Sequence, residues 1–332
     1  MARLAGGRQV SLRHSSRRRL VAGLAAAVAL PLLPGAARAA PLRVLAAPST
    51  SSILVARAVD HLGWGEAALA VWRSPDEMRA AVVGARADVV TLPTNVAANL
   101  YNRGLALRLV DVVSAGAMHV LSRDPAIRGI ADLRGRRLRL YFRGDMPDVT
   151  TRWLLARHGL EPGRDVAVDY AGSAVETAQL LLAGRAETAL LNEPAASAAI
   201  VQARAAGIAL HRAFTLQRAW AEATGDATPL PMAGSAVTSV DADPGAVRAL
   251  HAAVAEAADW ARTDPHAAGR LAEARLGFAA APTTMALEAA TIGVDAAADV
   301  RPAIERFLAA LAELSPDLVG GRLPDPAFYV EL

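Results

Sequence analysis

Residues 86–95 read RADVVTLPTN, and residues 185–194 read RAETALLNEP. The two stretches stand 99 positions apart, and each carries an Arg-Ala pair, an acidic residue and a short run of β-branched or aliphatic residues. A run of this kind, bounded by turn residues, favours a strand. A helical pattern precedes each Arg-Ala pair, so we expect the same order of helix, turn and strand twice in the chain.

The similarity extends to both sides at the same offset. Asp88 is matched by Glu187, and six pairs are identical: Ser74 and Ser173, Glu77 and Glu176, Arg86 and Arg185, Ala87 and Ala186, Leu92 and Leu191, and Ala97 and Ala196. Alanine-rich chains give chance identities, so the repeat predicts architecture only. Two similar βαβ lobes with a cleft between them are the natural packing of such halves.

Short β-branched runs alternate with longer alanine-rich amphipathic runs, which is typical of an α/β fold with a mainly parallel sheet. The expected strands are 42–45, 67–72, 87–92, 138–142, 166–170 and 187–191. The expected helices are 53–61, 75–83, 148–157 and 174–182, followed by C-terminal helices at 245–263, 265–276, 283–291 and 300–314.

Two extended segments, 118–123 and 233–239, are predicted to connect the lobes. If the chain leaves the first lobe at one segment and returns at the other, the C-terminal helices belong with the first lobe. The predicted division is therefore a leader at 1–39, a first lobe made of 40–122 and 236–332, and a second lobe at 123–235.

The first 39 residues have the layout of a cleaved export signal. The stretch SRRRL at 16–20 precedes an apolar run over 20–33, and Ala37-Arg38-Ala39 is a small-x-small cleavage site. Paired arginines after serine indicate a twin-arginine signal, which exports folded proteins. The alternative is a retained membrane anchor, but a spanning helix needs about 20 apolar residues. We therefore expect a periplasmic or extracytoplasmic protein.

Composition excludes several classes of function. Seven of the 35 basic side chains and none of the 32 acidic ones lie in the leader, so the rest of the chain is weakly acidic and is not expected to bind nucleic acid. Cysteine is absent, which excludes disulfides, thiolate metal sites and a lipid anchor on cysteine. The seven histidines form no metal-binding spacing, and no nucleotide-binding or hydrolase motif is present. No cofactor and no metal are predicted.

Four stretches resemble a known group of proteins, the extracytoplasmic solute-binding proteins of ABC transporters that serve nitrate, sulfonates, taurine and thiamine precursors. They are RADVVTLPTN at 86–95, IADLRGRRL at 130–138, DVTTRWLLARHGL at 148–160 and LAGRAETALLNEP at 182–194. The resemblance covers roughly residues 41–240. It implies a type II periplasmic binding fold, in which two α/β lobes joined by two hinge crossovers close on one small ligand. It also implies a membrane permease and an ATPase as partners.

Ligands of open α/β sheets bind beyond the carboxyl ends of the strands. Here those ends are loops that open helices, at 48–52, 93–96, 143–148 and 192–194, where backbone N–H groups point outward. The predicted ligand-binding residues are Ser49, Thr50, Ser51, Thr94, Asn95, Arg143, Gly144, Asp145, Asp148, Asn192, Glu193 and Trp220.

Several of these residues have a purely structural alternative. The hydroxyls at 49–51 suit helix capping as well as ligand contact, and Asn95 suits an Asx turn after Pro93. Trp220, like Trp72, is a candidate stacking face for a ligand ring, whereas a lone tryptophan is more often part of a core.

The charged candidates disagree about the charge of the ligand. Arg143 is the only cation in its loop and suits an anionic ligand, or else a salt bridge with Asp145. Asp145, Asp148 and Glu193 disfavour a strong anion, unless they serve as acids at helix starts. A small polar heterocycle or a zwitterion satisfies both sets better than a bare inorganic anion.

The predicted function is that of a monomeric, non-enzymatic binding component of an ABC importer, which captures a small polar or anionic solute by hinge closure. Sulfonate, nitrate, pyrimidine and similar heterocycles remain open as ligands. One alternative is an enzyme on the same fold, similar to a pyrimidine synthase or a desulfinase, but such relatives depend on reactive His or Cys. The other alternative is a ligand-sensing partner of a membrane receptor.

Overall fold

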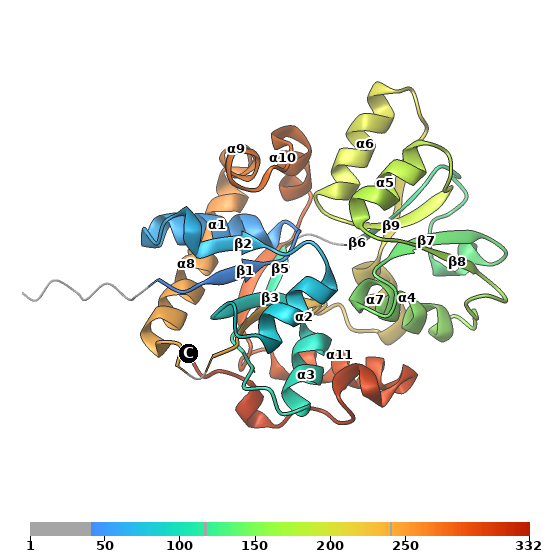
Figure 1. Ribbon diagram of the computed structural model, residues 1–332. Helices are drawn as coiled ribbons and strands as arrows, with labels where there is room; N and C mark the ends of the chain where they lie inside the picture. Colours follow the sequence, from blue (N-terminus) through green and yellow to red (C-terminus); the bar gives the residue numbers. More distant parts are fainter. Residues whose placement is uncertain (1–40, 116–117, 240) are drawn as a thin grey trace, which may run out of the picture. The chain divides into compact units, whose positions relative to one another are not determined.

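The computed structural model describes residues 41–115, 118–239 and 241–332 (Figure 1). The predicted export signal at 1–39 lies outside these residues. Within the described ranges, no helix combines the length and the apolar character that crossing a membrane requires. The same ranges contain two five-stranded sheets and one two-stranded sheet, with helices between the strands.

The first sheet has the strand order β2-β1-β3-β11-β4. Its strands are β1 (Val44–Ala46), β2 (Leu69–Val71), β3 (Val89–Pro93), β4 (Arg108–Leu109) and β11 (Ala233–Val237). β1 pairs in parallel with β2 and with β3, whereas β11 runs antiparallel to β3 and β4. The three parallel strands therefore end at one edge, where an open α/β sheet binds its ligands.

The second sheet has the order β10-β6-β9-β7-β8. Its strands are β6 (Met118–Ser122), β7 (Arg137–Tyr141), β8 (Ala167–Ala171), β9 (Thr188–Asn192) and β10 (His211–Thr215). β7 is parallel to β8 and β9, and β6 is antiparallel to β9 and β10. Read from its other edge, the order β8-β7-β9-β6 has the same pattern of directions as β2-β1-β3-β11. The predicted two-lobed α/β fold is confirmed.

The repeat is also visible at two helix starts. Ser74 precedes α2 (Pro75–Val83) and accepts a hydrogen bond from the Glu77 N–H at 3.2 Å, and Ser173 precedes α5 (Ala174–Leu182) and accepts from the Glu176 N–H at 3.1 Å. Each glutamate also accepts from a backbone N–H just before its helix, at 2.8 Å and 2.7 Å. This reciprocal capping satisfies N–H groups that a helix start leaves open.

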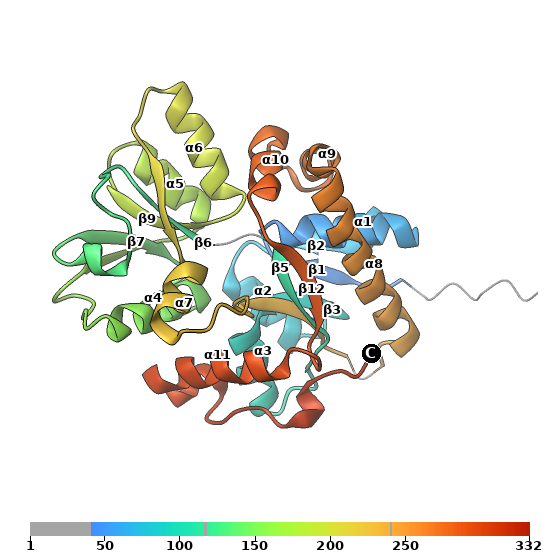
Figure 2. The ribbon, with the colours of Figure 1, turned by 180° about the vertical axis from the view of Figure 1, so that it is seen from behind.

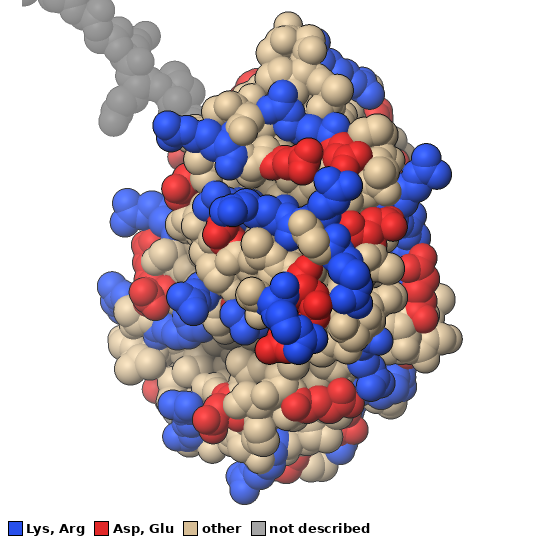
Figure 3. All heavy atoms as spheres, turned by 90° about the vertical axis from the view of Figure 1, so that its right-hand side faces the viewer, with Lys and Arg blue, Asp and Glu red and all other residues tan. Residues whose placement is uncertain are grey.

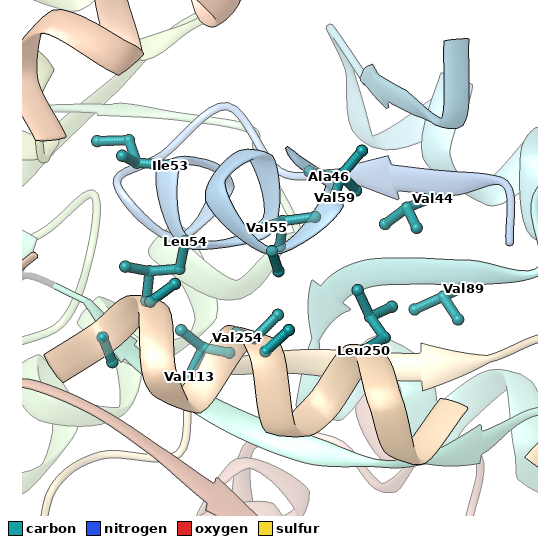
Figure 4. Close-up of a cluster of buried hydrophobic side chains, with 14 of the residues drawn as sticks. Val44, Ala46, Ile53, Leu54, Val55, Val59, Val89, Val113, Leu250 and Val254 are labelled. Atoms are coloured by element: carbon teal, nitrogen blue, oxygen red, sulfur yellow. The ribbon is translucent and has the colours of Figure 1, made fainter. Parts of the chain in front are cut away.

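The first lobe is built on a core between α1 (Ser51–Leu62), α8 (Pro244–Thr263) and the first sheet. Leu250 and Val254 of α8 face Val55 of α1 beside β1 and β3 (Figure 4). α1, α8 and α9 lie together when the molecule is seen from behind (Figure 2). The remaining helices are α3 (Thr94–Asn102), α4 (Met146–Arg157), α6 (Ala195–Ala205), α7 (Leu216–Thr224), α9 (Pro265–Leu276), α10 (Ala280–Glu288) and α11 (Arg301–Leu314).

The strand pairing shifts both predicted lobe boundaries. β6 lies in the second sheet, although the boundary after residue 122 assigned Met118–Ser122 to the first lobe. β11 lies in the first sheet from Ala233 onward, although the boundary before residue 236 left its first residues in the second lobe. Both segments were expected to be linkers, but each pairs as an antiparallel strand inside a sheet.

The C-terminal region is less simply divided than expected. β12 (Ile292–Ala296) pairs with β5 (Asp111–Ala115) immediately after the region predicted to be helical up to residue 291. α11 buries Ile304 and Leu308 in the core of the first lobe, and Phe307, Ala310 and Leu311 in the core of the second. This helix therefore belongs to both lobes, not to the first alone.

Candidate functional site

Two of the predicted loops meet between the lobes. The loop after β1 and the loop after β9 are joined by two hydrogen bonds: Thr50 N–H donates to the Glu193 carbonyl at 3.3 Å, and Asn192 Nδ2 donates to the Pro48 carbonyl at 3.2 Å. Each loop follows a parallel strand of its own sheet. The carboxyl edges of the two sheets therefore face each other, as the ligand-binding edges of a two-lobed α/β protein should.

Two further contacts join the lobes. Arg79 of α2 is ion-paired with Asp145, which stands at the start of α4 in the second lobe. The rings of Trp72, after β2, and Phe142, after β7, are 6.4 Å apart between centroids. Burial raises the pKa of Asp145, and the pairing with Arg79 offsets this only in part.

Two asparagines of this region hold carboxamide oxygens that lack a hydrogen-bond partner. Asn95 is the second residue of α3, which follows β3, and is 3% exposed, and Asn192 ends β9. The Oδ1 atoms of both are buried and unpaired among the described residues. An unsatisfied buried acceptor is costly, about 1–3 kcal/mol each, so these oxygens are suited to a donor brought by a ligand.

Of the hydroxyl candidates, Thr50, Ser51 and Thr94 are buried and Ser49 is half-buried, and several form hydrogen bonds within the protein. Ser49 and Ser51 share a hydrogen bond between their Oγ atoms at 2.8 Å, and the Thr50 side chain is 1% exposed without capping α1. Thr94 donates from Oγ1 to the Pro231 carbonyl at 2.6 Å and from its N–H to the Met232 carbonyl at 3.1 Å. Thr94 thus holds the returning crossover rather than offering its hydroxyl to the space between the lobes.

The carboxylate of Glu193 makes its contacts within its own lobe. Its Oε1 accepts from Arg212 Nη2 at 2.8 Å and lies 3.3 Å from His119 Nε2, while Oε2 accepts from the Ser197 N–H at 2.9 Å. The carboxylate is 2% exposed, and burial lowers the pKa of His119. The side chain is therefore a structural centre of the second lobe, and only the backbone carbonyl of Glu193 reaches the other lobe.

The loop at 143–148 makes contacts within the second lobe and one contact with the first lobe. Asp148 accepts from the Gly144 N–H at 2.8 Å, from Arg152 Nε at 2.8 Å and from the Tyr170 hydroxyl at 2.9 Å, all within the second lobe. Arg143 stacks on the Tyr170 ring, 5.3 Å from its centroid, and does not form the alternative salt bridge with Asp145. Arg143 and Gly144 line a separate hollow beside α4. Asp145 of this loop contacts the first lobe through Arg79, and Phe142, just before the loop, contacts it through Trp72.

Trp220 lies away from the facing loops, in the core of the second lobe. Its ring packs 4.5 Å from Trp153 and 5.7 Å from Phe307, and the residue is 5% exposed. The core alternative for a lone tryptophan therefore describes this residue. Trp72, considered beside it in the sequence, is the tryptophan that stands between the lobes.

Arg79 and Phe142 were missed as site residues. A usable signal existed for Arg79, because α2 follows β2, whose carboxyl end lies at the same sheet edge as those of β1 and β3. Phe142 carries a positive φ of 54°, a conformation that the sequence does not reveal for an aromatic residue. Within the described residues, no group of three or more His, Asp or Glu side chains is placed to hold a metal ion.

Known structures have a similar fold. An ABC transporter from Parabacteroides distasonis is 25% identical with a TM-score of 0.72, over 87% of this chain and 98% of that one. The periplasmic aliphatic sulphonate binding protein SsuA from Escherichia coli has a TM-score of 0.66 at 15% identity, over 84% and 95% of the two chains. The periplasmic nitrate-binding protein NrtA from Synechocystis PCC 6803 has 0.60 at 15%, over 85% and 84%.

At the level of sequence, no curated protein matches the chain. The model of the NMT1-like family matches residues 54–276, which is more than half of the chain and spans both lobes. The sequence resemblance and the fold therefore agree. The chain belongs to the NMT1-like family, and its fold is that of periplasmic solute-binding proteins.

Proposed function

We propose that this protein is the solute-binding component of an ABC importer, and that it captures its solute between the facing loops by closure of the two lobes. The observation that carries the proposal is the pair of buried, unpartnered oxygens of Asn95 and Asn192 beside loops that join the lobes. An enzyme on this fold is not favoured, because the family and its structural neighbours are binding proteins.

The polar groups favour a ligand that donates hydrogen bonds. Both unpartnered side-chain atoms are acceptors, and Arg79, the cation that joins the lobes, is already paired with Asp145. A bare oxyanion has only acceptors to offer. We therefore infer that the solute is a small polar heterocycle or a zwitterion with N–H groups, and that Trp72 and Phe142 provide an aromatic wall for it.

In this role the protein delivers its solute to a membrane permease and its ATPase. It works outside the cytoplasm, where the twin-arginine signal would take it. The proposed protein acts as a monomer, without a cofactor or nucleic acid. Mass analysis of the exported N-terminus tests the signal: a mature chain beginning before Leu20 would contradict cleavage.

Calorimetric titration with hydroxymethylpyrimidine, riboflavin, taurine, an alkanesulfonate and nitrate tests the ligand class. We expect a donor-bearing compound to bind, and we expect Asn95→Ala to weaken it at least about tenfold, as the loss of a buried hydrogen bond predicts. Gln202→Ala, on the exposed side of α6, is the matched control and should bind as the wild type does. Tight binding of nitrate alone would contradict the proposed ligand class.

A further inference from the structure

A hollow of about 420 Å³ lies between α4 and the end of α11. Its size falls within the range of ligand pockets, about 300–1,000 Å³. The lining residues are Arg143, Gly144, Asp148, Val149, Arg152, Ala156, Pro162, Leu314, Ser315 and Leu318. Arg143, Gly144 and Asp148 come from the loop at 143–148, but the lining includes none of Asn95, Asn192, Trp72 and Phe142, the residues proposed to hold the solute, so this hollow is a different site.

The charges around the hollow leave one cation without a counter-ion. Asp148 is neutralised by Arg152, which donates from Nε at 2.8 Å, and it also accepts from the Gly144 N–H and the Tyr170 hydroxyl. Arg143 is exposed, lies over the Tyr170 ring and is paired with no described carboxylate. Figure 3 shows a face of the molecule on which many arginine side chains are exposed, with acidic side chains among them. An arginine held by stacking keeps its donors free for a bidentate contact with a carboxylate.

The opposite wall is apolar and open to solvent. Leu314 is 38% exposed, one of the few large aliphatic side chains of the described residues with that much exposure. Leu318 also lines the hollow, and Val149 and Ala156 of α4 add apolar surface to it. Apolar side chains beside an unpaired cation match a molecule with an anionic head and a hydrocarbon body.

We propose that this hollow is a second binding site, and that it takes a small amphipathic monoanion with a carboxylate head and a short aliphatic chain. The carboxylate lies on the Arg143 guanidinium, and the chain covers Leu314 and Leu318. Asp148 lies at the base of the hollow as part of a closed set of hydrogen bonds, so it does not repel the head.

Calorimetric titration of the exported protein with octanoate tests the site. We expect millimolar or tighter binding, weakened at least about tenfold by Arg143→Gln because the charge-assisted contact is lost. Leu314→Glu should also abolish it, by placing a carboxylate where the aliphatic chain lies. Arg204→Gln removes an exposed arginine of α6 outside the hollow and should leave binding unchanged. Octanamide, which has the same chain and no charge, should bind at least about tenfold more weakly.

The two sites can be told apart. Asn95→Ala should keep octanoate binding intact, whatever it does to the solute. The proposal is overturned if octanoate fails to bind at about 5 mM, if Arg204→Gln weakens it as much as Arg143→Gln does, or if it is lost in Asn95→Ala and kept in Arg143→Gln. Failure of every solute to bind between the lobes would contradict the proposed function and leave the octanoate result standing.

Discussion

Arg79 on α2 and Asp145 at the start of α4 are ion-paired across the two lobes, with Nη1 also 3.4 Å from Oδ2. The two partners are unequally exposed, because the Arg79 side chain is 35% accessible and that of Asp145 is 11%. Asp145 occupies the N-cap position of α4 but does not cap its own helix, so its carboxylate is directed to the other lobe. The contact therefore joins the two lobes directly.

The unequal burial predicts unequal effects of mutation. Arg79→Gln leaves a buried carboxylate without its cation and should cost about 1–3 kcal/mol in the free energy of unfolding. Asp145→Asn leaves a guanidinium that water can reach and should cost less than about 1 kcal/mol. Urea denaturation at pH 7 measures both variants. Equal losses would mean that the pair is solvated and that the burial of Asp145 does not matter.

The same pair predicts how the Arg79→Gln penalty depends on pH. Burial already raises the pKa of Asp145, and removing the cation raises it further. The penalty should therefore be fully present well above that raised pKa and should shrink as the pH falls through it, because a protonated carboxyl needs no cation. Urea denaturation of wild type and variant between pH 7 and pH 4 follows this change. A penalty that stays constant over that range would contradict it.

Arg43 and Asp88 predict a loss of stability in the same direction of pH for the first sheet, but at lower pH, because the pKa of Asp88 is lowered and not raised. Asp88 accepts from the Arg43 N–H at 2.8 Å, from Nε at 3.0 Å and from Nη2 at 2.7 Å, and these hydrogen bonds lower the pKa of Asp88. The contribution of the pair to stability is present above the pKa of an unfolded aspartate, about 3.9, and is lost as the pH falls through the lower folded value. Asp88→Asn should lower the melting temperature at pH 7 but not at pH 2. Equal losses at both pH values would show that the charge is irrelevant.

Glu193 is predicted to matter for stability more than for solute contact. Glu193→Gln weakens its contacts with Arg212 and His119 and should cost about 2–3 kcal/mol, as expected for hydrogen bonds to charged groups. Glu187→Gln is the matched control, since Glu187 is exposed just before the same strand and should change stability by less than about 0.5 kcal/mol. Chemical denaturation of both variants decides between the roles. If the Glu193→Gln protein is as stable as the wild type but no longer binds solute, the Glu193 side chain contacts the ligand, as the sequence predicted.

Sequence periodicity predicted the elements whose signals are local. α2, α5 and α9 begin and end where their capping residues and apolar spacing placed them. The facing loops after β1 and β9 also follow from local signals, because the carboxyl ends of parallel strands are a property of the fold. The rule gives the two loops, whereas the hydrogen bond from the Thr50 N–H to the Glu193 carbonyl is known only from the structure.

Residues whose roles depend on distant partners were harder to predict. Glu193 looks like a ligand contact until Arg212, 19 positions later, is seen to hold it. Trp220 is drawn into the core by Phe307, which comes from a helix expected to serve the first lobe alone. The strands β6 and β11 carry apolar patterns that suit a linker or an antiparallel strand equally, so only their pairing distinguishes the two.

α11 supplies the most direct test of that long-range packing. Phe307 is fully buried, and the centroid of its ring lies 5.7 Å from that of Trp220 in the second lobe. Its helix, α11, comes after β12, which pairs with β5 and not with a strand of the second sheet. Phe307→Ala should cost about 3–5 kcal/mol, whereas Ile304→Val on the face toward the first lobe should cost about 0.5–1.5 kcal/mol. Because Trp220 adjoins the new cavity and packs on Trp153, tryptophan fluorescence should report the loss in the second lobe. If the fluorescence and the melting temperature of Phe307→Ala equal those of the wild type, α11 does not stabilise the second lobe and packs only against the first.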